Sequence, residues 1–142
     1  MREYSLSDLK YISREALAAK VRSKDEGLAV IDVRDSDYIG GHILNGQNIP
    51  TSTHEYRMPE LVRQLVNKNI VVFHCTLSQQ RGPKSALLYL RERERLQARP
   101  STPESANRQK VYVLDGGFSK WQEKYGKDTE VTEGYLADLW QD

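Results

Sequence analysis

The sequence predicts an α/β domain with a mostly parallel central sheet and helices on both faces. Three short apolar runs rich in β-branched residues, at 28–33, 70–74 and 111–115, are typical of strands buried on both faces. Segments with helical periodicity lie between and after these runs. Because strands that alternate with helices form parallel sheets, this order favours the α/β class.

The first half of the chain carries start and stop signals for two helices. Ser13 is a suitable N-cap for the good helix formers over 14–23. Residues 34–50 are rich in glycine and end in proline, so we expect turns there. A second helix is predicted over 59–66, with Pro59 in its first turn, where the missing N–H costs no hydrogen bond.

The second half contains two further predicted helices. One covers 83–96, where apolar residues fall on one helical face and charged residues on the other. The other covers 118–126 and follows a glycine pair that breaks the preceding strand. Helices on both sides of the last strand are consistent with a sheet that is covered on both faces.

We expect one domain over residues 1–142, with its core at about 10–125. Residues 98–110 combine prolines with polar residues, which predicts an exposed loop. Residues 127–142 form a C-terminal tail, in which four apolar side chains at near-helical spacing favour packing on the domain. The four are Tyr135, Leu136, Leu139 and Trp140.

Composition narrows the class of protein. Lysine and arginine number 21 against 20 aspartate and glutamate, so the formal net charge of +1 gives no reason to expect nucleic acid or a membrane as partner. No apolar run is long enough to cross a bilayer, and the N-terminus lacks the apolar core of a secretory signal. A single cysteine excludes an internal disulfide and a cysteine-rich zinc site. We therefore expect a cytoplasmic or nuclear protein without a metal or other cofactor.

The single cysteine, Cys75, directly follows the predicted strand at 70–74 and opens the seven-residue loop CTLSQQR. Ligands of parallel α/β sheets bind at this end of the strands. A loop that leads into a helix N-terminus can point its backbone N–H groups at an anion, and the same field favours Cys75 as a thiolate nucleophile. Arg81, the last loop residue, adds a planar and permanently charged fork that matches a tetrahedral oxyanion.

A lone cysteine after a strand is more often a buried and inert residue, and a Cys-x5-Arg spacing is weak evidence by itself. Here the spacing lies between a strand and a predicted helix, with Gly82 and Pro83 directly after the arginine. This context makes the functional interpretation the stronger one. The loop therefore predicts a site for an oxyanion with an electrophilic centre, namely a phosphoryl group or arsenate.

The loop HCTLSQQRGP resembles the active-site loop of the rhodanese-fold phosphatases, a group with M-phase inducer dual-specificity phosphatases, small single-domain fungal relatives and arsenate reductases. Two further blocks resemble the same superfamily. One is residues 32–50, with the motifs DVR and GGHI, and the other is residues 113–121. Together the blocks cover about residues 10–125. The resemblance implies a rhodanese-like fold with a central sheet of about five strands.

The resemblance also implies roles for the loop residues. Cys75 would be the nucleophile, and Arg81 would clamp the oxyanion. Ser78 would in addition bond to the thiolate or assist its departure. The backbone amides that cradle the substrate oxygens would belong to Thr76, Leu77, Ser78, Gln79, Gln80 and Arg81.

Three residues outside the loop would have structural roles. The resemblance implies that Asp32 and Arg34 tie the neighbouring strand end to the loop. His42 would be a packed or capping histidine, because the sequence shows no cluster of metal ligands around it.

Two positions depart from the family pattern. Gln80 stands where the mitotic phosphatases carry a glutamate, so the loop contains no acid to protonate a leaving group. Asp37 or an acid in the tail could supply that proton, but the sequence does not select one. Val33 stands where several relatives carry a cysteine, so no protective disulfide with Cys75 can form.

Two activities fit the same loop. The first is a cysteine-dependent phosphatase of the protein-tyrosine or dual-specificity type, which would form a thiophosphate on Cys75 and act on a phosphoprotein or a small phosphate ester. The second is an arsenate reductase that attacks arsenate with the same thiolate, and the missing acid slightly favours it. Because the chain has no second thiol, glutathione as co-substrate and a glutaredoxin as partner would then be required.

Two further interpretations are weaker. A phospho-binding module without turnover is disfavoured because Cys75 and Arg81 are both present. Sulfur transfer is disfavoured because the sulfurtransferases of this fold have a loop one residue shorter. We therefore predict the phosphatase first, with arsenate reduction as the alternative.

Overall fold

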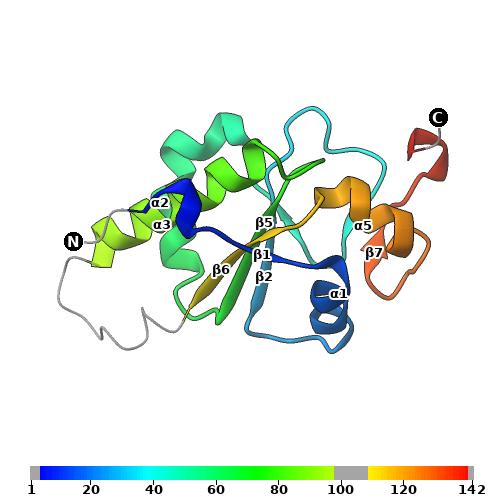
Figure 1. The fold of residues 1–142 in the computed structure, drawn as a ribbon, viewed down its shortest axis with the longest axis horizontal. Coiled ribbons are helices and arrows are strands. Elements are labelled where there is room, and N and C mark those ends of the chain that lie inside the picture. Colours follow the sequence, from blue (N-terminus) through cyan, green and yellow to red (C-terminus); the bar gives the residue numbers. More distant parts are fainter. Residues whose placement is uncertain (1–3, 98–108, 141–142) are drawn as a thin grey trace.

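The computed structural model describes residues 4–97 and 109–140 (Figure 1). At its centre is a five-stranded sheet in which all neighbouring strands are parallel, in the order β1-β6-β5-β2-β4. The strands are β1 (Lys10–Ile12), β2 (Leu28–Asp32), β4 (Gln47–Asn48), β5 (Ile70–His74) and β6 (Lys110–Leu114). The predicted fold class is confirmed, including the number of strands in the sheet.

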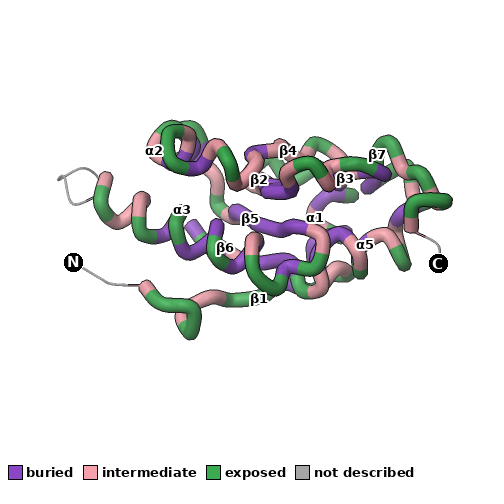
Figure 2. Tube along the Cα trace, turned by 90° about the horizontal axis from the view of Figure 1, so that it is seen from above, coloured by how far each residue is buried: buried purple, intermediate pink, exposed green. Residues whose placement is uncertain are grey.

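Helices cover both faces of this sheet and create two separate hydrophobic clusters. They are α1 (Arg14–Arg22), α2 (His54–Gln64), α3 (Arg81–Gln97) and α5 (Gly117–Tyr125). α1 and α5 pack on one face, around Trp121, and α2 and α3 pack on the other face, around Phe73 and Tyr89. Buried residues run along the central strands β2 and β5 (Figure 2), as expected for strands covered on both sides.

The second helix is longer than predicted. α2 begins at His54 rather than at Pro59, so the proline lies inside the helix. A proline there removes one backbone hydrogen bond of the helix. The helix nevertheless forms, because Met58, Leu61 and Val62 bury an apolar face in the cluster below it.

The shortest strands were not predicted, because two or three residues carry no recognisable period. Besides β1 and β4, these are β3 (His42–Ile43) and β7 (Thr132–Glu133), which pair antiparallel in a small second sheet. This pairing fastens the C-terminal segment beside the segment that follows β2. No helix in the described ranges is both long and apolar enough to span a bilayer.

One residue of the predicted exposed loop at 98–110, Gln109, is buried, whereas Lys110 after it is exposed. Residues 98–108 lie outside the described residues, but Gln109 is only 7% exposed. Its side chain accepts a hydrogen bond from Tyr89 Oη (2.7 Å) and donates one to the Leu65 carbonyl (2.7 Å). The prediction was wrong at this position because an amide side chain can be buried when its polar atoms are paired.

The loop that follows β5 is held by the first residues of α5. The Phe118 N–H donates to the Cys75 carbonyl (2.9 Å), and the Ser119 N–H donates to the Thr76 carbonyl (2.9 Å). Gly117 allows this close approach, because a Cβ at this residue would lie 2.4 Å from the Thr76 oxygen. Its φ of 61° also lies in the left-handed region that favours glycine.

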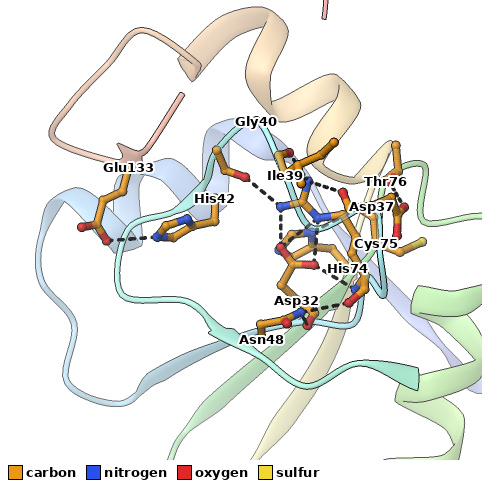
Figure 3. A network of polar contacts seen from close by, with 12 residues as sticks. Asp32, Asp37, Ile39, Gly40, His42, Asn48, His74, Cys75, Thr76 and Glu133 are labelled. Atoms are coloured by element: carbon orange, nitrogen blue, oxygen red, sulfur yellow. Dashed lines mark hydrogen bonds and ion pairs between the residues drawn. The ribbon is translucent and has the colours of Figure 1, made fainter. Parts of the chain in front are cut away.

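A buried ion pair shapes the segment after β2 (Figure 3). The Arg34 guanidinium is fully buried and donates to both carboxylate oxygens of Asp32, with Nε–Oδ1 3.0 Å and Nη2–Oδ2 2.7 Å. It also donates to the carbonyls of Gly41 (2.8 Å) and Ile39 (3.3 Å). The chain at 37–41 therefore folds around one charged side chain, and the network saturates that charge with acceptors.

Asp32 is ionised in the folded protein. Burial would raise the pKa of Asp32, but the positive charges of His74, when it is protonated, and of Arg34 outweigh burial and lower it. Burial lowers the pKa of His74 itself, so this histidine is neutral near pH 7. Arg34 is therefore the partner that keeps the Asp32 carboxylate charged at neutral pH.

We expect Gly117→Ala to lose about 3 kcal/mol of unfolding free energy, from the left-handed backbone and the collision with the loop together. Gly134→Ala is the matched control, because its φ is 66° but the nearest atom to its added Cβ lies 3.9 Å away. The control should lose only about 1 kcal/mol. Urea unfolding and the rate at which a thiol reagent modifies Cys75 test this, and only Gly117→Ala should expose the thiol. Equal losses in the two variants would contradict the proposed contact.

Replacing Asp32 by asparagine should lower the unfolding free energy by about 3–5 kcal/mol, because Arg34 would keep its charge without its buried partner. Asp115→Asn, at an exposed aspartate directly after β6, should change it by less than about 0.5 kcal/mol. The folded-state pKa of Asp32 lies below its unfolded value of about 3.9. The stabilisation is therefore present above that value and is lost as the pH falls through the folded-state pKa. Urea unfolding across pH measures both effects, and a loss in Asp32→Asn no larger than in the control would refute the role of the pair.

Candidate active site

The loop at 75–80 closes into a cup between β5 and the N-terminus of α3. α3 begins at Arg81, slightly earlier than predicted, so its first turn faces the loop. Ser78 turns the chain with a left-handed φ of 55°, which a non-glycine residue adopts only at a cost. This turn lets the Ser78 N–H donate to Cys75 Sγ at 3.2 Å. Strain at this position is consistent with a loop whose geometry serves a ligand.

The cup has hydrogen-bond donors to spare. Among the described residues, the backbone N–H groups of Thr76, Leu77, Gln79 and Gln80 have no acceptor. Within the same part of the chain, the hydroxyl of Ser78 is buried and also has no partner. Because buried polar groups normally find partners, the unpaired Ser78 hydroxyl indicates a site for a ligand, and the unused N–H groups of the same loop suit an anion. Cys75, which is 3% exposed, lies among them with its sulfur bonded to an N–H.

Arg81 is paired with a carboxylate at the rim of the cup. Its guanidinium donates to both oxygens of Asp37, with Nη1–Oδ1 2.8 Å and Nη2–Oδ2 2.5 Å. Thr76 Oγ1 donates to the same carboxylate at 2.7 Å, and Asp35 lies 3.5 Å from Arg81 Nη1. The chain segment shaped by Arg34 thus positions the arginine that was predicted to clamp the oxyanion.

This pairing decides the charge of Asp37, which the sequence offered as one possible acid. Its hydrogen bond with Arg81 outweighs partial burial and, together with Thr76, holds the pKa of Asp37 well below its usual range. The same bond raises the pKa of Arg81. While the pair is intact, Asp37 is therefore a carboxylate at neutral pH and has no proton to donate.

The residues predicted to support the loop occupy different places. Asp32 and Arg34 shape the 37–41 segment and reach the loop indirectly, through Asp37 and through His74, whose Nε2 lies 3.8 Å from Asp32 Oδ2. His42 is not brought to the cup, and its ring points toward Glu133, with 3.5 Å between Nε2 and Oε1 (Figure 3). No group of three or more potential metal ligands occurs among the described residues.

The cup opens into a pocket of about 560 Å³ with a polar floor and apolar sides. The buried Cys75 marks its floor, Thr76 and Arg81 add polar groups above it, and the C-terminal tail contributes Leu139 and Trp140 to its sides. The tail packs only in part as predicted, because Leu136 and Leu139 are more than half exposed. Their exposure is a signal of function that spacing alone could not reveal, since it depends on where the tail returns to the domain.

The arrangement can bind a tetrahedral oxyanion and attack its centre. The sulfur supplies a nucleophile, the unused N–H groups and Arg81 supply positive potential, and the apolar lining can contact an organic group attached to the oxyanion. The predicted roles of the loop residues stay predictions, and the pairing of Arg81 with Asp37 was not predicted. The two residues lie far apart in sequence, and no local pattern connects them.

Comparison with known proteins places this geometry in a family. The sequence matches the Rhodanese-like domain over residues 14–124. It is 38% identical to the CDC25-like phosphatase YCH1 of Saccharomyces cerevisiae, over 99% of this chain and 100% of that protein. It is 35% identical to Arsenate reductase 2.1 of Oryza sativa subsp. japonica, over 80% of this chain and 68% of that protein.

A solved structure agrees with the sequence matches. Ygr203w, described as a yeast protein tyrosine phosphatase of the Rhodanese family, superposes with a TM-score of 0.75 and 37% identity. The superposition covers 96% of this chain and 100% of that one. The domain match, the identities and the shared fold together show that this chain belongs to the rhodanese-like family.

Proposed function

We propose that this protein is a cysteine-dependent phosphatase that hydrolyses phosphate monoesters. The observation that carries the proposal is the loop, in which Cys75 Sγ accepts the Ser78 N–H while neighbouring N–H groups and the buried Ser78 hydroxyl have no partner among the described residues. The names of the phosphatase relatives support this assignment. The physiological substrate is then a phosphoprotein or a small phosphate ester.

The reaction has two steps. The Cys75 thiolate attacks phosphorus, the bond from phosphorus to the ester oxygen breaks, and a thiophosphate forms on the sulfur. Water then attacks phosphorus, the sulfur–phosphorus bond breaks, and phosphate and the thiolate are released. Both transition states place charge on the equatorial oxygens, which the loop N–H groups and Arg81 stabilise.

Asp37 is a positioning residue in this scheme. It uses one N–H from each terminal nitrogen of Arg81, and the guanidinium has five N–H groups, so others remain for the substrate oxygens. A fixed guanidinium reduces the entropy lost when the oxyanion binds. Because paired Asp37 cannot protonate a leaving group, aryl phosphates should react faster than alkyl phosphates.

Arsenate reduction is the second candidate, and the absence of an acid in the cup favours it. The thiolate would attack As(V), with loss of hydroxide, and glutathione would then attack the Cys75 sulfur. Two electrons would pass to arsenic, which leaves as As(III), and a Cys75–glutathione disulfide would remain. A glutaredoxin would reduce that disulfide, because the chain has no second cysteine. The name of the rice relative supports this alternative.

Cys75→Ser should reduce hydrolysis of 4-nitrophenyl phosphate to the background rate while inorganic phosphate still binds, because the cup donors remain. Steady-state kinetics measure the first effect, and calorimetry measures the second. Turnover retained in the variant would exclude a thiophosphate on Cys75. If the reduced, folded wild type shows no turnover, arsenite production with glutathione and a glutaredoxin tests the second candidate directly.

Asp37→Asn should lower kcat/KM about tenfold for all aryl phosphates alike, because Arg81 loses its anchor. Asp35→Asn is the control, since Asp35 makes only a single, longer contact with Arg81, and its effect should be smaller. Since the pKa of Asp37 is held below its usual range, its titration should add no limb to the profile of kcat/KM between pH 5 and 8. A series of aryl phosphates with leaving groups of different pKa provides the measurement. A loss that grows with leaving-group pKa would show instead that Asp37 is the general acid.

A further inference from the structure

The C-terminal turn is anchored beside the cup. The Trp140 indole N–H donates to the Gly40 carbonyl at 2.9 Å, and its ring packs on Phe118 with 5.4 Å between centroids. The Leu136 N–H contacts the same carbonyl at 3.3 Å. The Phe118 N–H in turn donates to the Cys75 carbonyl, so Phe118 contacts both the tail and the residue that carries the nucleophile. The position of the turn Ala137–Trp140 relative to the cup is therefore defined by contacts.

Three large apolar side chains from separate segments converge on the pocket. Ile39, Leu77 and Leu139 are 58%, 51% and 53% exposed, and all three line the pocket above Cys75. Single exposed apolar residues are normal on a protein surface, but a group gathered around a polar floor marks a ligand site. Apolar sides with a few polar groups at the base are typical of sites for small organic ligands.

The size of the pocket argues for a ligand larger than an oxyanion. At about 560 Å³ it lies in the range of sites for small organic molecules. A free phosphate or arsenate ion would occupy the polar floor and leave the apolar sides without a partner. A phosphate that carries an aromatic ring would fill both parts, because the ring is apolar, flat and attached where the sides begin.

We propose that Ile39, Leu77 and Leu139 form an apolar wall that binds the aromatic ring of an aryl phosphate, as presented by a phosphotyrosine side chain. This inference rests on the proposed phosphatase function and names its substrate class. The wall contacts the aromatic ring and strengthens its binding, whereas the loop binds the phosphate group. Arsenate, free phosphate and alkyl phosphates gain nothing from it.

The experiment compares two inhibitors that share a phosphonate group, phenylphosphonate and methylphosphonate. Neither is hydrolysed, so calorimetry reports binding without turnover. The wild type should bind phenylphosphonate about tenfold more tightly, as expected for one apolar group in a partly open pocket. Leu139→Ala should reduce this ratio severalfold and leave the Kd of methylphosphonate unchanged. Leu136→Ala is the matched control, because Leu136 is equally exposed on the same tail but does not line the pocket, and it should change neither Kd.

A second variant guards against displacement of the tail. Ile39→Ala removes the wall from the opposite segment and should reduce the same ratio, while tryptophan fluorescence checks that Trp140 still packs in both variants. With peptides of one sequence, Leu139→Ala should lower kcat/KM for phosphotyrosine and not for phosphoserine. The proposed wall is refuted if the ratio of the Kd values for methylphosphonate and phenylphosphonate is unchanged in both variants. It is also refuted if both phosphonates lose affinity equally.

The outcomes also separate the two proposals. If the wall variants behave as expected but the wild type hydrolyses no aryl phosphate, the proposed phosphatase function fails and the ring site stands. If hydrolysis depends on Cys75 but neither Leu139→Ala nor Ile39→Ala changes the ratio of the two phosphonate Kd values, the phosphatase function is supported and the ring-binding wall is refuted.

Discussion

The guanidinium of Arg34 is the contact point of the segments that build the site. It neutralises Asp32 at the end of β2, gathers the carbonyls of the 37–41 segment, and lies 4.6 Å from the ring centre of Phe118 in α5. Phe118 holds the Cys75 carbonyl through its N–H and supports the Trp140 ring. One buried cation thus connects a strand end, the loop that carries Asp37, and the helix behind the nucleophile. A neutral side chain of similar size could fill the space but could not gather these acceptors.

Two ion pairs of different character follow from this arrangement. The pair of Arg34 with Asp32 is fully buried and saturated, so it acts as a rigid part of the core. The pair of Arg81 with Asp37 is partly open to water, so the N–H groups of the guanidinium that Asp37 does not use are accessible to a ligand oxyanion. The fold places the rigid pair behind the adjustable one. The side of the cup next to the core is therefore held rigidly, whereas the Arg81 side chain at its opening can adjust to a bound substrate.

Local patterns in the sequence were sufficient to predict the three longest strands and the loop that carries Cys75 and Arg81. β2, β5 and β6 are apolar runs, and the spacing of Cys75 and Arg81 between a strand and a helix indicated the loop. The start of α2 was predicted too late because a proline is typical of the first turn of a helix. In the structure, packing of the apolar face of α2 stabilises the helix although Pro59 lies inside it. Partners distant in sequence, such as Asp37 with Arg81 and Trp140 with Gly40, were not predictable. They depend on how turns return the chain to one edge of the sheet, which no short window of residues encodes.

The active site draws its reactive floor and its proposed ring-binding wall from different parts of the chain. The floor belongs to the β5–α3 junction, whereas Leu139 belongs to a short turn that is attached by a few contacts. Substitutions of the exposed Leu139 side chain can therefore accumulate without altering the residues that carry the sulfur and its hydrogen bond. Related proteins could diverge in substrate preference through the tail alone, with the same chemistry inherited unchanged. Selection would then act on two modules at different rates within one small domain.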